Sequence, residues 1–128
     1  MSDPVYEYLA GRGCPDFVVA GRLPGLVSAW ERVTQSVALG EEQEQDDYLN
    51  DVDGRQLLED VLPVSEPALR SEYVERIVAA DHLILKFLIP TSECLWGKAN
   101  AVKYGYARDR NWWYYHRPRA VDSTWRTF

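Results

Sequence analysis

Carboxylate side chains gather between residues 41 and 60, where the sequence could support acid–base or metal chemistry. This stretch holds nine acidic residues and one base, Arg55; the acids are Glu41, Glu42, Glu44, Asp46, Asp47, Asp51, Asp53, Glu59 and Asp60. So dense a run is typical of a solvated helix surface. Catalytic carboxylates, in contrast, are buried, and burial raises their pKa. We therefore expect an exposed acidic surface.

Part of this run, NDVDGRQLLED, follows the EF-hand calcium loop pattern at some positions only. Asp51, Asp53 and Gly54 match its third, fifth and sixth places. Leu49, however, stands where the first ligand is required, and Asp60 replaces the glutamate that closes the calcium shell with two oxygens. These two departures favour an acidic helix surface over a calcium site.

Other motifs for catalysis or cofactor binding are missing from the sequence. The string WGKAN contains a Gly–Lys pair, but Ser92 occupies the first glycine position of a P-loop and Ala99 has no hydroxyl for magnesium. His82 and His116 are the only histidines, and neither stands in a pattern of metal ligands. No G-x-S-x-G motif is present. We expect a protein that is not an enzyme and that binds no cofactor or metal.

The second unusual stretch is NWWYYHRPRA, in which four aromatic residues precede a basic cluster. In a strand, Trp112 and Tyr114 would point to one side and Trp113 and Tyr115 to the other. We expect Trp112 and Tyr114 in the core. Trp113 and Tyr115, with the neighbouring arginines, form a candidate surface, because Trp, Tyr and Arg are enriched at the hot spots of protein interfaces.

Charge is divided unevenly along the chain. The net charge is -6 and the pI is near 4.9, which argues against general affinity for nucleic acid. From Trp96 onward, however, seven bases face only Asp109 and Asp122; they are Lys98, Lys103, Arg108, Arg110, Arg117, Arg119 and Arg126. The acidic run and the basic tail could serve two binding surfaces, or they could pair with each other within the fold.

The apolar spacing predicts three helices followed by a small hairpin. Helices are expected over residues 24–39, 42–62 and 65–90, and strands over residues 102–106 and 112–116. The third helix is apolar on nearly every side in its later half, so we expect the other elements to cover it. The expected class is mainly α, with a three-helix core and a C-terminal aromatic-rich β-hairpin; α+β is the alternative.

Length and composition fit one water-soluble domain. The chain has 128 residues, of which 46% are hydrophobic and 27% charged. We expect an irregular arm over 1–15, a helical core over 16–90 and a hairpin with a tail over 91–128. No apolar run could span a bilayer, and the first residues do not resemble a signal peptide. Cys14 and Cys94 are expected as unpaired thiols, and the protein as cytoplasmic.

A combination of short patterns resembles small bacterial proteins of the immunity type, the partners that neutralise secreted toxins. It consists of DYLNDVDGRQLLEDVL, Asp81, Thr91 and the later WWYYHRP, within residues 24–119. The resemblance implies a cytoplasmic, non-enzymatic inhibitor that docks a toxin through an acidic face. It assigns no individual site residue.

Two functional hypotheses follow from the residues, with an enzyme using carboxylate chemistry ranked below both. The first is a small protein-binding protein that attracts a basic partner, such as a toxin, by electrostatic steering. Its candidate partner-binding residues are Glu41, Glu42, Glu44, Asp46, Asp47, Asp51, Trp113 and Tyr115. The alternative is a nucleic-acid or regulatory binding module that uses the aromatic and basic C-terminal segment. No membrane partner is expected.

Overall fold

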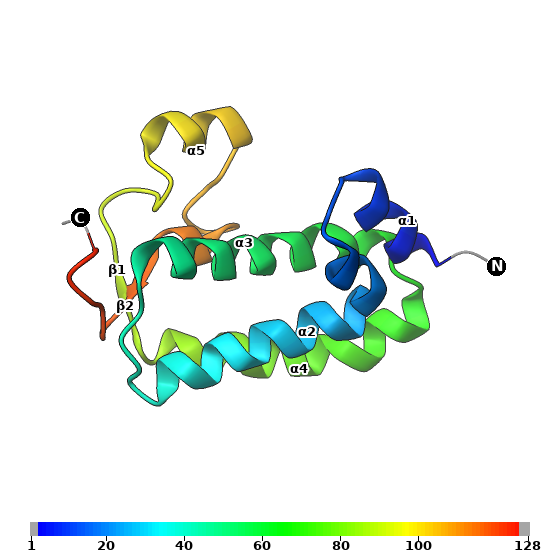
Figure 1. The fold of residues 1–128 in the computed structure, drawn as a ribbon, viewed down its shortest axis with the longest axis horizontal. Helices are drawn as coiled ribbons and strands as arrows, with labels where there is room; N and C mark the ends of the chain where they lie inside the picture. The colour runs from blue at the N-terminus through cyan, green and yellow to red at the C-terminus, as the bar shows by residue number, and fades with distance from the viewer. Residues whose placement is uncertain (1–2, 126–128) are drawn as a thin grey trace.

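The computed structural model describes residues 3–125, which form a mainly helical fold with one antiparallel pair of short strands (Figure 1). This confirms the expected class at that level. In chain order the elements are α1 (Pro4–Gly11), α2 (Asp16–Ala38), α3 (Gln45–Val61), the 3₁₀ turn η1 (Leu62–Val64), α4 (Pro67–Leu85), β1 (Leu88–Pro90), α5 (Lys98–Tyr104), the 3₁₀ turn η2 (Trp112–Tyr114) and β2 (His116–Pro118).

Helix α2 is the element on which the other long helices pack. It contacts both α3 and α4, and α1 packs against it as well (Figure 1). The expectation that the third helix would be covered by the others is wrong, because one face of α4 is open. Val74, Val78 and Leu85 are 40%, 46% and 39% exposed, whereas Ile77 and Ile84 are buried.

The N-terminal segment is helical, although an irregular arm was expected over 1–15. Asp3 caps α1, since its carboxylate oxygen Oδ1 accepts a hydrogen bond of 2.8 Å from the amide of Val5. Pro4 stands in the first turn, where its missing N–H costs nothing. Val5 and Leu9, four residues apart, are both buried. Capping and this apolar pair outweigh the glycines and prolines that suggested a loop.

Helix α2 starts well before the expected range of 24–39 and contains a break. The residues DFVVAG, which the pattern left undecided, form its first turns. Pro24 cannot donate to the preceding turn and its ring would clash there, and the backbone leaves the helical region at Arg22, with φ 54°. Gly40 follows the helix in the left-handed conformation, with φ 79°. This is the conformation in which a glycine commonly ends a helix.

Helices α3 and α4 lie within the ranges expected for them. The stripe that predicted α3 is confirmed, because Tyr48, Val52 and Leu58 are fully buried. Helix α4 ends five residues before Pro90 because the chain becomes extended there and forms β1.

The C-terminal segment differs most from the expectation. Residues 102–106 are not a strand, because α5 runs to Tyr104 and a turn follows. Residues 112–116 are not a strand either, since they begin with η2 and reach β2 only at His116. The observed sheet pairs β1 with β2, with Leu88 opposite Pro118. It therefore joins the end of α4 to the tail, and no local hairpin forms.

Turn chemistry and packing explain why these aromatic residues do not form a strand. Gly105, with φ 70°, ends α5 in the left-handed conformation. Asn111 accepts the amide of Ala107 on its side chain at 2.9 Å and the amide of Tyr114 on its carbonyl at 3.0 Å. The consecutive residues Trp113 and Tyr114 are both buried in the same core. A strand would send them to opposite faces, and tertiary packing overrides their strand propensity.

The core also extends beyond the three helices expected to form it. Leu9 of α1 and Cys94, Leu95, Trp113 and Tyr114 of the C-terminal segment are 5% exposed or less. They belong to the same apolar cluster as the buried faces of α2, α3 and α4. The C-terminal segment is thus part of the body of the fold and is positioned by it.

Candidate functional site

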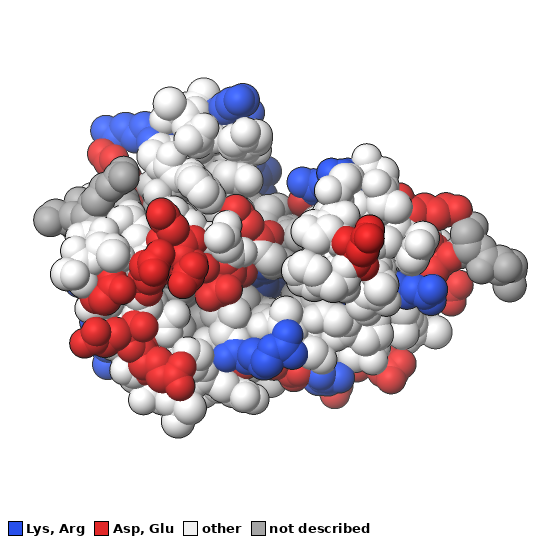
Figure 2. Space-filling model, viewed as in Figure 1, with Lys and Arg blue, Asp and Glu red and all other residues white. Residues whose placement is uncertain are grey.

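The acidic surface is formed by the first half of α3 and the loop before it. We define it by its members: Glu41, Glu42, Glu44, Asp46, Asp47 and Asp51. The first five are exposed, and Asp51 is half-buried. Buried Tyr48 and Val52 hold this part of α3 against the core, so the helix presents the carboxylates outward. Figure 2 shows acidic side chains gathered over this end of the molecule.

The carboxylates of the acidic surface are not neutralised by nearby bases. Among residues 3–125, none of the six lies within 4.0 Å of a lysine or arginine nitrogen. Repulsion from Asp47, the largest cause, raises the pKa of Glu44, with Asp122 and Asp46 also contributing. Burial, followed by repulsion from Asp47, raises the pKa of Asp51 to about 6. The surface therefore concentrates negative charge that the described part of the chain leaves unpaired.

The arginines of the basic tail bond to backbone carbonyls instead. Arg108 donates to Ser92 at 3.1 Å, Arg110 to Gly105 at 3.0 Å and Arg117 to Pro118 at 2.9 Å. The described ion pairs include none between these arginines, or Arg119, and a carboxylate. Arg126 lies outside the described residues. Pairing within the fold thus does not account for the division of charge in the part that is described.

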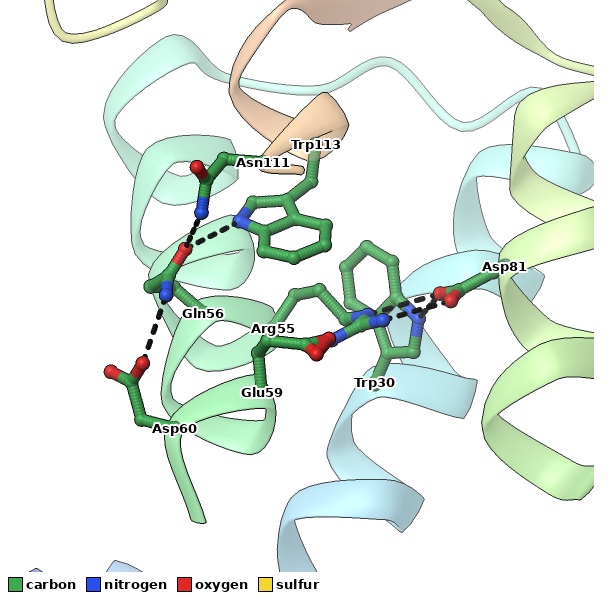
Figure 3. Close-up of polar contacts among 8 residues, drawn as sticks. All are labelled: Trp30, Arg55, Gln56, Glu59, Asp60, Asp81, Asn111 and Trp113. Atoms are coloured by element: carbon green, nitrogen blue, oxygen red, sulfur yellow. Dashed lines mark hydrogen bonds and ion pairs between the residues drawn. The ribbon is translucent and has the colours of Figure 1, made fainter. Parts of the chain in front are cut away.

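Trp113 is placed differently from the expectation and cannot contact a partner. Its side chain is only 1% exposed. Its indole donates to Gln56 Oε1 at 3.2 Å, and Asn111 donates to the same oxygen at 2.8 Å (Figure 3). The Arg55 guanidinium lies 4.4 Å from the centre of its ring. Trp113 therefore joins the C-terminal segment to α3 as a buried residue, and the prediction that it lies on a partner-binding surface is wrong.

The same buried cluster ties three helices together. Arg55 makes two hydrogen bonds to Asp81, of 3.1 and 2.9 Å, and one of 3.2 Å to Glu59 (Figure 3). Asp81 also accepts the Trp30 indole N–H at 2.8 Å. Because these side chains come from α2, α3 and α4 and satisfy one another, the cluster has a structural role and needs no ligand.

Tyr115 is only partly accessible. Its hydroxyl donates to the carbonyl of Tyr106 at 2.8 Å, and the Arg108 guanidinium lies 4.9 Å from its ring centre. Exposed basic and aromatic side chains occur instead on and around α5. Tyr104 is 57% exposed, with the Lys103 ammonium 5.2 Å from its ring centre. We call α5 and the following loop to Arg110 the basic lobe.

A cleft that was not recognised in the sequence lies between the basic lobe and the N-terminal end of the molecule. It has a volume of about 610 Å³, and Asp53, Gln56 and Asp60 of α3 line it together with Arg12. Trp96 closes it from the side of α5. Figure 2 shows this face hollowed between the basic lobe and the N-terminal end of the molecule. The only signal in the sequence is the seven-residue spacing of Asp46, Asp53 and Asp60, which places the three on one helix face.

No metal site or membrane-spanning helix is found in residues 3–125. No group of three or more His, Cys, Asp or Glu side chains there could hold a metal ion. Asp51, Asp53 and Gly54, the residues of the calcium-like string, lie within α3 rather than in a loop. None of the helices described has both the length and the apolar character required to cross a bilayer.

Comparison of the chain with protein-family models, curated proteins and solved structures finds no match.

Proposed function

We propose that this chain is a cytoplasmic, non-enzymatic binding protein that docks a basic protein partner through the acidic surface. The observation that carries the proposal is the charge of that surface, whose six carboxylates have no cationic partner in the described residues. Closely spaced like charges oppose folding. A basic partner would relieve their repulsion on binding, and their field would speed its approach.

The immunity-type resemblance of the sequence makes this proposal more specific. An inhibitor of a basic toxin needs a rapid encounter and a rigid docking face, and long-range attraction provides the first of these. The rigid face would be α3, which is anchored by buried Tyr48, Val52 and Arg55. We accordingly propose a toxin as the class of partner and neutralisation as the role.

Site-specific photo-cross-linking in the source organism tests the proposal. A photoreactive amino acid replaces Glu42 on the acidic surface, or Glu75, an exposed acid of α4, as the matched control. We expect a distinct adduct with a basic protein from position 42 and none from position 75, identified by mass spectrometry. Equal adducts from the two positions, no adduct from position 42, or an adduct with nucleic acid would contradict the proposal.

The basic lobe supports the alternative of a single-stranded nucleic acid ligand. Exposed Tyr104 lies beside Lys103, and Arg108 and Arg110 follow in the same lobe. Aromatic rings among bases can stack on nucleotides while the bases neutralise phosphate. Replacing Arg108 and Arg110 by Ser should then abolish oligonucleotide binding. We rank this function second, because the acids of α3 would repel phosphate.

A further inference from the structure

We propose that the cleft beside α3 receives an arginine side chain of the partner protein and binds its guanidinium group. This inference rests on the proposed function and deepens it by naming a specific pocket next to the acidic surface. The volume of about 610 Å³ lies within the range of sites that enclose small ligands. It leaves room for the side chain and part of the backbone that carries it.

Two carboxylates in the cleft have the chemistry to bind this group. Asp53 accepts the Trp96 indole N–H at 3.0 Å and the Tyr114 hydroxyl at 2.6 Å, and both bonds end on Oδ1. Its Oδ2 accepts no hydrogen bond from the residues described. Burial and the hydrogen bond to Asp53 raise the pKa of Tyr114, so this phenol stays a neutral donor. Asp53 is thus held in place with one oxygen open to a new donor.

The second carboxylate already binds a guanidinium group. Asp60 accepts Gln56 Nε2 at 3.0 Å on Oδ1 and Arg12 Nη1 at 3.0 Å on Oδ2. The Arg12 guanidinium also lies 5.6 Å from the centre of the Tyr8 ring. The side chain of Arg12 is 49% exposed, so it can turn toward solvent. An incoming arginine would compete with Arg12 for Asp60 and find a second carboxylate at Asp53.

Four aromatic rings also line the cleft, those of Trp96, Tyr104, Tyr106 and Tyr114. Tyr104 stacks on Tyr106 with 5.6 Å between ring centres, and Tyr106 stacks on Tyr114 at 4.4 Å. Trp96, which is 37% exposed, adds an indole. The faces of such rings attract cations, and a planar guanidinium can stack on them. The described lining of the cleft thus has two carboxylates, Asp53 and Asp60, but only one arginine, Arg12, and its aromatic rings also attract positive charge. These features favour a cationic ligand over an anionic one.

The position of the cleft fits a partner that sits on the acidic surface. Asp46, Asp53 and Asp60 are spaced by seven residues, and two helical turns bring such positions back to nearly the same face, about 10 Å further along the helix. Asp46 belongs to the acidic surface, and Asp53 and Asp60 line the cleft. A segment of the partner that binds the acidic surface and continues along α3 therefore reaches the cleft while it stays in contact with this helix.

The test uses two short peptides as probes, acetyl-Gly-Arg-Gly-amide and the same peptide with neutral citrulline, which keeps the shape of arginine. Binding is followed by NMR of the ¹⁵N-labelled full chain, through the Trp96 indole and the amides of residues 53–60. We expect saturable shifts there with the arginine peptide, and binding of the citrulline peptide weaker by about tenfold or more, since it lacks the charge-assisted bonds.

Three variants separate a cation site from its alternatives. Asp60→Asn should weaken binding of the arginine peptide, and Arg12→Gln should strengthen it by removing the competitor. Glu75→Gln, which changes the charge equally on exposed α4, should leave binding unchanged. Equal affinity for the citrulline peptide, or weaker arginine-peptide binding after Arg12→Gln, would overturn the proposal. So would shifts from inorganic phosphate that disappear in Arg12→Gln, because they would identify an anion site.

A fourth variant keeps this test separate from that of the proposed function. Replacing Glu42, Asp46 and Asp47 together by Gln, Asn and Asn removes charge from the acidic surface and none of the residues that line the cleft. We expect it to retain the peptide response. If the partner docks but the arginine peptide does not bind, the inference about the cleft fails alone. If the peptide binds but no basic partner exists, the proposed function fails and the cleft is left with a different cationic ligand.

Discussion

At the scale of single residues, the side chain of Arg55 is the centre of the polar contacts that link α2, α3 and α4. It is 5% exposed, and its charge is balanced by Asp81 and Glu59 while Trp113 covers its guanidinium. In the sequence Arg55 is merely the one base among nine acids, and nothing there indicates burial. Burying a charge is favourable only when its hydrogen bonds are satisfied, and the residues that satisfy this one come from distant parts of the chain.

Removing this side chain should therefore be costly. We expect Arg55→Met to lower the free energy of unfolding by about 3–5 kcal/mol, because it leaves the Asp81 carboxylate, which is only 15% exposed, without its cation. The double variant Arg55→Met/Asp81→Asn should lose less than the sum of the two single variants, since the orphaned charge is gone while Trp30 keeps an acceptor. Urea unfolding measures all three. Strictly additive losses, or a loss no larger than that of Arg76→Met in an exposed pair, would contradict the assigned role.

Among the elements, α3 provides residues of both the acidic surface and the cleft. Its half-buried Asp51 makes the stability of the fold depend on pH. Burial and Asp47 raise the pKa of Asp51 from 3.8 to about 6 in the folded state. The folded state then holds this proton more tightly than the unfolded chain does. The contribution of Asp51 to the free energy of unfolding consequently falls as the pH rises from about 4 to about 6, and it stays low at higher pH.

Asp51→Asn should accordingly stabilise the domain at neutral pH, and the gain should vanish below about pH 4, where both states are protonated. Thermal unfolding across this pH range measures the difference from the wild type. Glu75→Gln on α4 serves as the control for a surface change of the same charge. A gain that is constant with pH, or a loss at neutral pH, would show that Asp51 is not destabilised by its surroundings.

How well each element was predicted depended on how local its determinants are. The apolar stripes of α3 and α4 predicted both helices and residues such as Tyr48 and Ile84 that they bury. The missed elements depend on contacts or caps that the apolar pattern does not reveal. The N-terminal helix rests on the Asp3 cap, the turns of the tail rest on Gly105 and Asn111, and β2 needs a partner far back in the chain. Four adjacent aromatics suggested a strand because propensity ignores where the core lies.

The candidate site was predicted to a similar extent. The exposed acids of the acidic surface were found from composition, because a dense run of carboxylates is rarely buried. Trp113 was misplaced, since its face was inferred from strand alternation that does not occur. The cleft was missed, because Arg12, Asp53 and Trp96 are far apart in sequence and only the fold brings them together.

Across the whole molecule, the division of charge persists from sequence to fold. The acidic surface lies on the loop before α3 and the first half of this helix, and the basic lobe, formed by α5 and the following loop, projects from the body of the fold (Figure 1). The described residues do not join them by ion pairs. The two leading functions use different surfaces, so one variant separates them. Removing acids from the acidic surface should weaken the binding of a basic protein if that surface docks the partner, and should strengthen the binding of an oligonucleotide if the basic lobe binds nucleic acid.

The central claim, that the acidic surface is the docking surface, is tested most directly by the rate at which the cross-linked basic partner associates. We expect the wild-type rate to fall steeply with salt, and the Glu42→Gln/Asp46→Asn/Asp47→Asn variant to associate more slowly, on the order of tenfold at low salt. Glu66→Gln/Glu72→Gln/Glu75→Gln, which removes as much charge from α4 and its N-cap, should associate at nearly the wild-type rate. Equal slowing in both triple variants would contradict the claim. So would binding of a single-stranded oligonucleotide by the wild type near physiological salt, if that binding tightens in the variant that lacks Glu42, Asp46 and Asp47.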